Sequence, residues 1–278
     1  MSASSDITLT VGGTDYTVSC PLYGYASSII LSLIFSPLSP KGYGIWDNGA
    51  TNDYRMLKCE FLLNETEMET LLNTFKDSNK GRGISVDMTL PSGSGFYPYC
   101  PDKGDAGTFQ SRLIEIDPGN KLEEPYGWFR CAATFIAESF PSYSLPSQIS
   151  EDDLKIGSIE NLRYPPDGAK SKSNYIVNSQ HSMDGTVSTI DKNYDAYSTI
   201  LPMICNQSKS AALINHVVSS VRDSNVTIVA PSGYYLFGRD NSDSGTYTCQ
   251  CLNDSMEVTH DAFDRFSFPL SFYLVSAA

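Results

Sequence analysis

The chain has 278 residues, of which 41% are hydrophobic and 18% are charged, and its formal net charge is -13. This length suits one large domain or two domains of ordinary size, and the composition excludes collagen, coiled coil and wholesale disorder. An acidic chain is repelled by phosphate, which argues against nucleic-acid binding by charge neutralisation. The longest apolar run, residues 29–35, is too short to span a bilayer, so we expect no membrane insertion.

The N-terminus and the cysteines indicate where the protein is made. Residues 1–6 lack the basic and apolar stretches of a signal peptide. The chain has 7 cysteines, and an odd number without an export signal predicts reduced thiols in a cytoplasmic setting. We therefore expect synthesis in the cytoplasm.

Motifs for catalysis, cofactor binding and metal binding are scarce. The chain contains no nucleophile elbow, phosphate-binding loop, dinucleotide fingerprint or zinc-protease motif. Its 3 histidines fall in unrelated contexts, and Cys249, Cys251 and His260 lack a fourth ligand at the spacing typical of zinc sites. We expect no enzymatic activity, no metal and no cofactor.

In chain order, the first expected element is a β-hairpin. Residues 7–11 alternate between apolar and polar side chains, Gly12 and Gly13 can adopt positive φ angles, and residues 16–18 return. Residues 29–53 follow as a long inserted hairpin or loop that is rich in apolar side chains.

A capped helix between two strands comes next. Residues 57–63 read as a strand, and Asn64 and Glu67 form a capping-box pattern at the start of a helix. The helix carries one apolar stripe, made of Met68, Leu71, Leu72 and Phe75. Residues 84–90 alternate as a half-buried strand and lead into a Pro-Ser-Gly turn at residues 91–93.

Two more strands complete the first half. Gly107 opens a strand after a loop that is rich in Asp and Gly, and residues 128–136 form an aromatic-rich strand. Residues 140–148 contain prolines and small polar side chains, which resist regular structure. We interpret them as the linker between two halves.

The second half begins with the same kinds of element. We expect a hairpin between residues 162–164 and 174–177, and a strand at 199–205 that Pro202 restricts to an edge or a bulge. Asn206 or Ser208 then caps a helix. The apolar stripe of this helix comprises Ile214, Val217, Val218 and Val221.

The remaining elements of the second half also match the first. A strand at 226–230 leads into a Pro-Ser-Gly turn at 231–233, Gly245 opens a strand after an Asp-rich loop, and residues 266–274 form an aromatic-rich strand. The offset between matched points drifts from about 142 to about 138 residues, as loop insertions would produce.

The repeated order predicts an internal duplication. The expected fold is mostly β with one helix per domain, arranged as two tandem β-sandwich or barrel domains. The first domain covers residues 1–148, with the long insertion near 29–53, and the second covers residues 149–278.

A hairpin, a strand, a capped helix and further strands form a layout that resembles the tail-tube type β-barrel of tailed bacteriophages. The resemblance extends over nearly the whole chain at the level of element order. In that family, subunits form rings around the DNA channel, and the sheets of neighbouring subunits join into a continuous inner wall. Duplicated members are similar in tail tubes and in baseplate hubs, where three chains supply six barrels.

The resemblance implies a non-enzymatic structural virion protein of the phage tail: tail tube, distal tail or baseplate hub. Its partners would be copies of itself, as a homotrimer of duplicated chains or a homohexamer, and other tail proteins. DNA would pass through the lumen without specific binding. The finished protein would lie in the virion after synthesis in the host cytoplasm.

Two questions stay open at this point. The inserted segment either contacts another subunit or ring, or covers the core of its own domain; the candidate inter-subunit contacts are Ile29, Ile30, Leu33, Phe35, Ile45 and Trp46. The alternative function is a two-domain β-sandwich module that binds a carbohydrate or a receptor. The 17 tyrosines and 13 phenylalanines would suit the stacking of sugars on aromatic rings.

Overall fold

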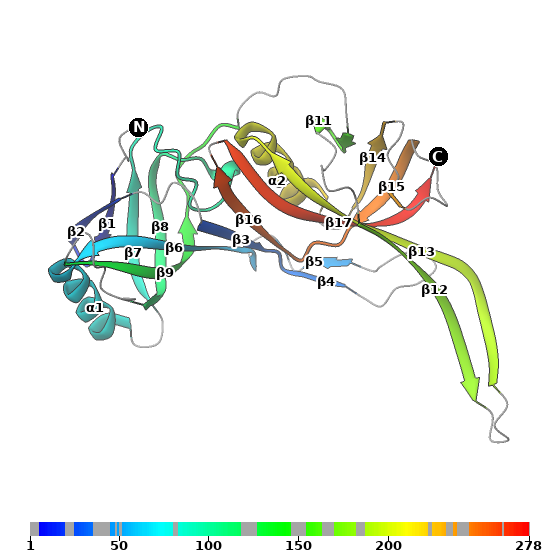
Figure 1. Cartoon of the computed structure of the whole chain (residues 1–278), viewed down its shortest axis with the longest axis horizontal. Coiled ribbons are helices and arrows are strands. Elements are labelled where there is room, and N and C mark those ends of the chain that lie inside the picture. Colours follow the sequence, from blue (N-terminus) through cyan, green and yellow to red (C-terminus); the bar gives the residue numbers. More distant parts are fainter. Residues whose placement is uncertain are drawn as a thin grey trace.

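The computed structural model describes residues 6–19, 25–35, 45–47, 49, 52–79, 83–117, 127–145, 154–162, 170–181, 187–221, 224–231, 236–237, 245–262 and 264–277. Over these residues the protein is mostly β, with one large antiparallel sheet and two α-helices (Figure 1). The mostly β fold with a helix in each half is as expected. The predicted boundary at residue 148 lies outside the described residues.

The N-terminal half covers residues 6–139. Its elements are β1 (Asp6–Val11), β2 (Thr14–Ser19), β3 (Tyr25–Ile30), β4 (Leu33–Phe35), β5 (Ile45–Asp47), β6 (Tyr54–Asn64), α1 (Glu65–Asn79), β7 (Ile84–Leu90), the short 3-10 helix η2 (Pro101–Lys103), β8 (Gly107–Asp117) and β9 (Trp128–Ser139). The strands pair in the order β2-β1-β7-β8-β9-β6-β3, and β4 pairs with β5 separately.

The C-terminal half covers residues 154–277. Its elements are β10 (Leu154–Ile156), β11 (Ile159–Leu162), β12 (Lys170–His181), β13 (Val187–Cys205), α2 (Gln207–Ser220), β14 (Asn225–Ala230), β15 (Gly245–Cys251), β16 (Ser255–Ala262) and β17 (Arg265–Ala277). Its strands pair in the order β11-β10-β14-β15-β17-β13-β12. Each position in this order matches the corresponding position in the N-terminal half.

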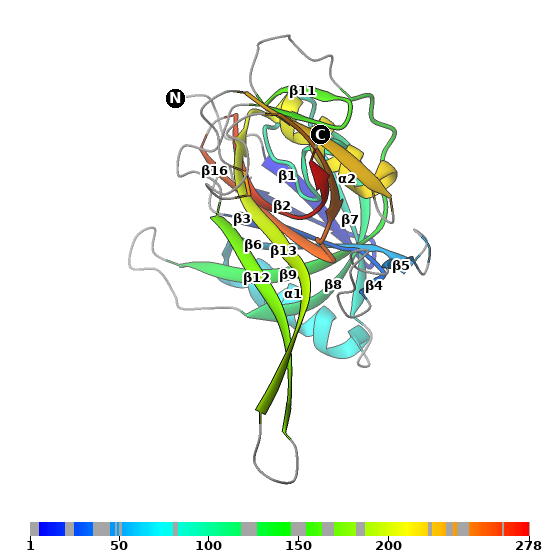
Figure 2. The ribbon, with the colours of Figure 1, turned by 90° about the vertical axis from the view of Figure 1, so that its right-hand side faces the viewer.

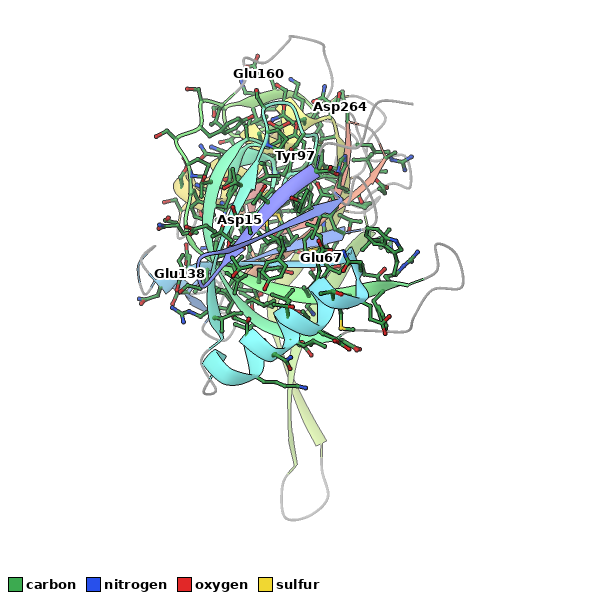
Figure 3. All side chains as sticks on the ribbon, turned by 90° about the vertical axis from the view of Figure 1, so that its left-hand side faces the viewer. Asp15, Glu67, Tyr97, Glu138, Glu160 and Asp264 are labelled. Carbon is green, nitrogen blue, oxygen red and sulfur yellow. The ribbon has the colours of Figure 1, made fainter. Side chains whose placement is uncertain are left out.

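Local sequence signals account for many of these elements. The turn between β1 and β2 uses Gly12 and Gly13, with φ angles of 58° and 84°. At the start of α1 the Glu67 amide donates to Asn64 Oδ1 (2.9 Å) and the Asn64 amide donates to Glu67 Oε2 (3.3 Å), so the predicted capping box is confirmed. Figure 3 labels Glu67 on this helix. The Lys209 amide donates to Asn206 Oδ1, which identifies Asn206 as the cap of α2.

One expected hairpin is wrong. The second half starts with the β10–β11 hairpin, whose turn uses Gly157 at a φ angle of 60°. Residues 174–177 instead belong to β12, which pairs with β13. A Cβ at Gly157 would lie 2.0 Å from His216 Nε2, so close packing on α2 adds to the requirement for glycine here. The Pro-Pro-Asp-Gly sequence suggested a turn at 165–168, which lies outside the described residues.

Pro202 lies inside β13, directly opposite Pro269 of β17. Neither proline has an N–H, so the two can face each other only as a pair that is not hydrogen-bonded. The described pairing of β13 with β12 begins at Ile200, opposite Lys170. Pro202 therefore lies inside β13 without costing a ladder hydrogen bond to β17.

The two halves join in one sheet. β16 pairs with β17 on one side and with β3 of the N-terminal half on the other, over six opposed positions from Ser255↔Ile30 to His260↔Tyr25. Figure 2 shows the joined sheet from the end of the molecule. Strands β3 and β16 are more than 200 residues apart in the sequence, so this joint is a tertiary feature.

The buried apolar residues form two clusters. One contains residues between Ile7 and Phe135, and the other contains residues between Leu154 and Phe272. The second cluster also takes in Ile29, Leu31 and Cys100 from the N-terminal half. The joint is therefore backed by shared core packing as well as by strand pairing.

The most extended element is the hairpin of β12 and β13. It leaves the body of the molecule as a two-stranded arm at the lower right of Figure 1, and Figure 2 shows the same projection. The sequence did not predict this arm. The long insertion that was expected at 29–53 contains the short β4–β5 hairpin. The β4–β5 hairpin lies between β3 and β6 in the chain. The arm is formed by β12 and β13, which occupy the matching positions in the sheet of the other half.

Candidate assembly surfaces

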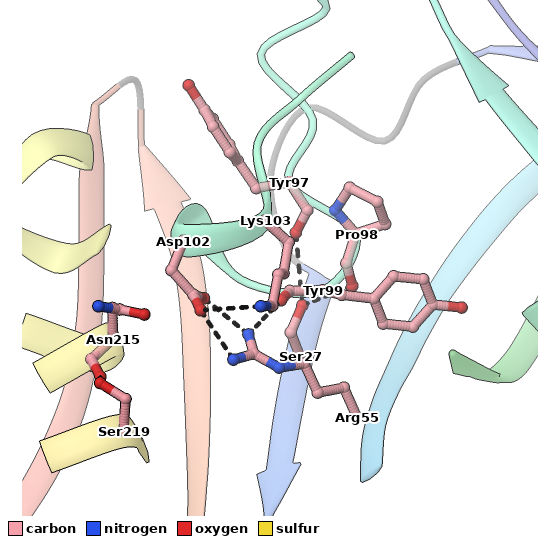
Figure 4. A network of polar contacts seen from close by, with 9 residues as sticks. All are labelled: Ser27, Arg55, Tyr97, Pro98, Tyr99, Asp102, Lys103, Asn215 and Ser219. Carbon is pink, nitrogen blue, oxygen red and sulfur yellow. Dashed lines mark hydrogen bonds and ion pairs between the residues drawn. The ribbon is translucent and has the colours of Figure 1, made fainter. Parts of the chain in front are cut away.

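A loop from the N-terminal half strengthens the joint. The connection between β7 and β8 carries η2, which packs against α2 of the C-terminal half (Figure 4). Beneath it, Ser27 of β3 donates to the carbonyl oxygen of Pro98 (2.9 Å). The loop therefore contacts both sides of the joint, and its position depends on polar side chains from the sheet.

A buried ion pair fixes this loop. Arg55 of β6 donates from Nη1 to Asp102 Oδ1 (2.6 Å), from Nη2 to Asp102 Oδ2 (2.7 Å) and from Nη1 to the Tyr99 carbonyl oxygen (2.8 Å). Both side chains are buried, 7% and 1% exposed. Burial acts to lower the pKa of Arg55, but the charge and hydrogen bonds of Asp102 outweigh it and raise that pKa. Such a bidentate pair holds one geometry.

An aromatic and histidine cluster lies at the end of the β3–β16 ladder. Tyr25 Oη lies 2.9 Å from His260 Nδ1 and accepts the Tyr97 amide proton at 2.9 Å. The His260 ring stacks on Phe266, with centroids 4.4 Å apart. Burial lowers the pKa of His260, although the Ala262 backbone, Asp261 and Asp264 act to raise it. The cluster favours a neutral imidazole.

The segment that leads out of the N-terminal half also contacts the other half. Tyr143 Oη accepts a hydrogen bond from Gln207 Nε2 (2.7 Å) at the start of α2. The Gln207 amide donates to Asp264 Oδ1 (2.6 Å). Lys103 lies over the Phe140 ring, 5.0 Å from its centroid. Of these contacts, the hydrogen bond between Tyr143 and Gln207 crosses between the halves, so the joint involves Tyr143 as well as β3 and the β7–β8 loop.

One face of the joined sheet is open to solvent. A row of directly opposed residues crosses five strands of this face, in the order Thr259, Ala26, Lys58, Thr134 and Glu115. The opposite face of the same strands is the core. An open depression of about 400 Å³ lies on the exposed face and includes Lys58, Glu60, Glu115 and Asp117 in its lining. Thr134 Oγ1 donates to Glu115 Oε2 at 3.2 Å.

The exposed face is weakly acidic where the structure describes it. On strands β3, β6, β8, β9, β16 and β17, its acidic side chains are Glu60, Glu115, Asp117, Glu138, Glu257 and Asp261, and its basic ones are Lys58, Arg112, Arg130 and Arg265. Three ion pairs join Arg130 to Glu60 (3.4 Å), Arg265 to Asp261 (3.5 Å) and Arg112 to Glu138 (2.5 Å). Ala26, Ser28 and Thr259 make the centre of the face small and neutral.

The six residues predicted to contact another subunit lie in different environments. Ile29 is 1% exposed and packs with Leu31 in the core of the C-terminal half, and Leu33 packs against the same cluster. Ile30 is half-buried. Phe35, Ile45 and Trp46 lie in β4 and β5, but their side chains lie outside the described residues. Both original interpretations missed this packing across the joint, while a contact of the segment with another subunit stays a prediction.

The next features are the groups among the described residues that could bind a metal ion or react. Among them, no group of three or more His, Cys, Asp and Glu side chains is placed to hold a metal ion. The described cysteines, Cys59, Cys100, Cys131, Cys205, Cys249 and Cys251, are all buried, and burial raises the pKa of Cys249 and Cys205 to about 12. Within the described ranges, no helix combines the length and apolar character of a membrane span.

Sequence reasoning missed the residues that build the joint. Arg55 and Asp102 are 47 positions apart, and His260 and Tyr25 are 235 apart. The strongest available signal was a charged residue, Arg55, at an inward position of an alternating strand. Neither the comparison with protein-family models nor the comparison with curated proteins gives a match for this chain.

Proposed function

We propose that this chain is a structural virion protein that forms a ring in a phage tail, as a tail tube, distal tail or baseplate hub component. The observation that carries the proposal is the joint. Two halves with the same strand order are joined edge to edge into one sheet through β3 and β16. A chain that is internally duplicated in this way contains one complete contact of the kind that a ring repeats.

The geometry of the joint suits a ring. It is heterologous, because the N-terminal half contributes β3 and the C-terminal half contributes β16. Repetition of a heterologous contact produces a closed ring if the rotation closes, and closure also removes exposed strand edges. Each half would occupy one ring position, so a trimer of duplicated chains would supply six positions.

The exposed sheet face is the candidate wall of the DNA conduit. Its centre is small and neutral at Ala26, Ser28 and Thr259, and acidic side chains outnumber basic ones around it. Carboxylates repel phosphate, and on β3, β6, β8, β9, β16 and β17 three of the four basic side chains pair with carboxylates, which leaves few sites for counterion-releasing contacts. Such a wall would let DNA pass without specific binding.

Negative-stain electron microscopy over a concentration series tests the proposal. We expect rings or short tubes with an open centre at high protein concentration. Isolated two-lobed particles at every concentration would contradict it.

A pelleting assay with cell-surface glycans tests the alternative, a carbohydrate- or receptor-binding module. Two of the described exposed aromatic side chains, Phe140 and Tyr143, already contact Lys103 and Gln207 within the chain. We therefore expect no co-pelleting. Saturable binding that a soluble glycan displaces would replace the ring proposal with the binding module.

Deleting residues 36–50 tests the part of the inserted segment beyond the core contacts of Ile29 and Leu33. If β4 and β5 contact another subunit, the deletion weakens ring formation and leaves the unfolding temperature nearly unchanged. A ring that assembles unchanged removes this segment from the interface.

A further inference from the structure

The loop between β7 and β8 crosses the joint and is anchored alternately in the two halves. We call residues 95–104 of this loop the strap. Phe96 and Tyr99 are fully buried in the core of the N-terminal half. Cys100 is buried in the core of the C-terminal half, and Tyr97 packs against that same core. Side chains that follow one another along the strap therefore hold opposite sides of the joint.

Specific contacts hold the anchors on each side. On the N-terminal side, Tyr99 Oη donates to Ser111 Oγ (2.7 Å), and Asp102 forms the buried ion pair described above (Figure 4). On the C-terminal side, the Tyr97 ring lies edge-on to the ring of Phe266, with centroids 5.3 Å apart, and η2 packs on α2. The strap is thus attached to both halves by contacts of defined geometry.

The backbone of the strap is strained at Cys100. Its φ and ψ angles are 78° and 157°, a combination that is found almost only in glycine. A residue before a proline, such as Pro101, ordinarily has a negative φ angle. Such a conformation persists only where the surrounding structure imposes it. The anchors in the two halves, and not the local preference of the sequence, therefore hold the strap in its position.

The two ends of the strap are tied together. Ser94 Oγ donates to the Asp105 carbonyl oxygen (2.6 Å), and the Gly95 amide donates to Asp105 Oδ2 (3.1 Å). At the other end, Gly104 has a φ angle of 80°, and a Cβ there would lie 2.5 Å from Cδ2 of Tyr143. Loops whose ends meet in this way form compact units.

Strand pairing at the joint leaves the angle between the halves variable. β3 and β16 pair over six opposed positions, and the rotation between adjacent strands of a sheet ranges from about 10° to about 35°. The strap adds a contact away from this ladder, because it packs on α2, whose buried side chains belong to the core of the C-terminal half. Two separate contacts fix an angle that one row of hydrogen bonds does not.

We propose that the strap sets the angle between the two halves of the chain, and that this angle decides how many chains close a ring. The first statement concerns a single chain. The second rests on the proposed ring, to which every chain contributes its internal angle once. Any change in the angle is therefore repeated with each chain, and the ring closes at another number of chains or not at all.

A distance measurement between the halves tests the first statement. Spin labels on an introduced ketone-bearing amino acid replace Glu69 of α1 and Thr227 of β14, which are exposed, and double electron–electron resonance records the distribution of their separations. Tyr97→Ala combined with Cys100→Ala removes the two side chains that anchor the strap in the core of the C-terminal half. We expect the distribution to become about twofold wider or more, given the range of rotation between adjacent strands.

Phe75→Ala combined with Cys59→Ala is the matched control. It also removes a half-buried ring and a buried thiol, but both of these pack within the N-terminal half. Its distribution should stay as narrow as that of the parent protein. Tyr97→Ala alone, which keeps every fully buried side chain in place, should give an intermediate width. An unchanged width in the double variant of the strap, or equal broadening in the control, overturns the first statement.

Mass photometry tests the second statement by counting the chains in each ring. The parent protein and the control should give one ring size, whereas the double variant of the strap should give several sizes or open spirals. One ring size in that variant, together with a widened distance distribution, overturns the second statement. If the parent protein forms no rings, the proposed function and the second statement fail together, while the distance measurement still decides the first.

Discussion

The two helices occupy matching positions but are buried to very different extents. α2 buries a continuous set of side chains, Ser210, Ala211, Ala212, Leu213, Ile214 and Val217. Over residues 65–76, where its side chains are described, α1 buries only Met68 and Leu71. The difference arises because η2 of the N-terminal half covers α2. A helix that must pack on two sides needs small and apolar side chains around most of its circumference, whereas α1 needs only one apolar stripe.

The two halves also differ in the strand that β8 represents in one half and β15 with β16 represent in the other. β8 runs without interruption, whereas its counterpart is divided into β15 and β16 by residues 252–254. Asn253 satisfies the backbone at this break: Oδ1 accepts from the Ser271 amide (2.7 Å) and Nδ2 donates to the Pro269 carbonyl oxygen (3.2 Å). The break frees β16 to pair with β3.

The largest expected effect comes from breaking the ion pair that fixes the loop at the joint. Asp102→Ala leaves the Arg55 guanidinium buried without its carboxylate partner, and we expect a loss of about 3–5 kcal/mol in the free energy of unfolding. Urea denaturation measures this loss. The double variant Arg55→Leu with Asp102→Leu should recover most of it, because no charge is then buried. A loss below about 1 kcal/mol in the single variant would contradict a structural role.

The unequal burial of the helices predicts unequal costs of truncation. Leu213→Ala in α2 removes a fully buried side chain and should cost about 2–5 kcal/mol. Leu72→Ala in α1 removes a half-buried side chain of the same size, and we expect less than half that loss. Thermal and urea unfolding of both variants measure the ratio. Equal losses would mean that the η2 contact does not bury α2 in solution.

The two helix caps should cost similar amounts, since each uses an Asn side chain on a backbone amide at 2.9 Å. Asn64→Ala and Asn206→Ala are each expected to lower the free energy of unfolding by about 1 kcal/mol. Asn73→Ala, at an exposed position inside α1, is the control and should change it by less than about 0.5 kcal/mol. A cap variant that behaves like the control would remove that cap from the stability of its half.

The smallest effect concerns pH and the joint. Burial lowers the pKa of His260 below its ordinary value of 6.5. The unfolded chain thus binds the proton more readily, so stability is complete above about pH 6.5 and falls as the pH drops toward the folded-state pKa. Thermal unfolding of the parent protein and His260→Gln across this range measures the effect. His216, whose pKa burial also lowers, should leave a residual dependence in the variant. Identical pH profiles would contradict a contribution from His260.

Local sequence patterns predicted many of the helices, strands and helix caps, but they could not predict contacts between residues far apart in the chain. The capping box at Asn64, the strand Ile84–Leu90 and the cap at Asn206 followed from residues within one turn or one strand. The β12–β13 arm was missed because residues 170–174 carry no apolar alternation. The second hairpin was predicted in the wrong place because the Pro-Pro-Asp-Gly sequence was taken as its turn, whereas the observed turn uses Gly157.

The candidate assembly surface was even less predictable. The sequence near Arg55 gives no sign of Asp102, and the sequence near Tyr25 gives no sign of His260, because each pair meets only when the chain folds. Ile29 read as a possible outer contact because it lies in an apolar run. Its burial depends on the second half, which no local pattern describes.

A cryo-electron microscopy reconstruction of the assembled protein tests the central claim most directly, that the joint within the chain is repeated between chains. We expect a closed ring in which the sheet is continuous from one chain to the next, with equal rotations between successive halves. A ring whose sheet is interrupted between chains, or a protein that stays as single two-lobed particles, would contradict it.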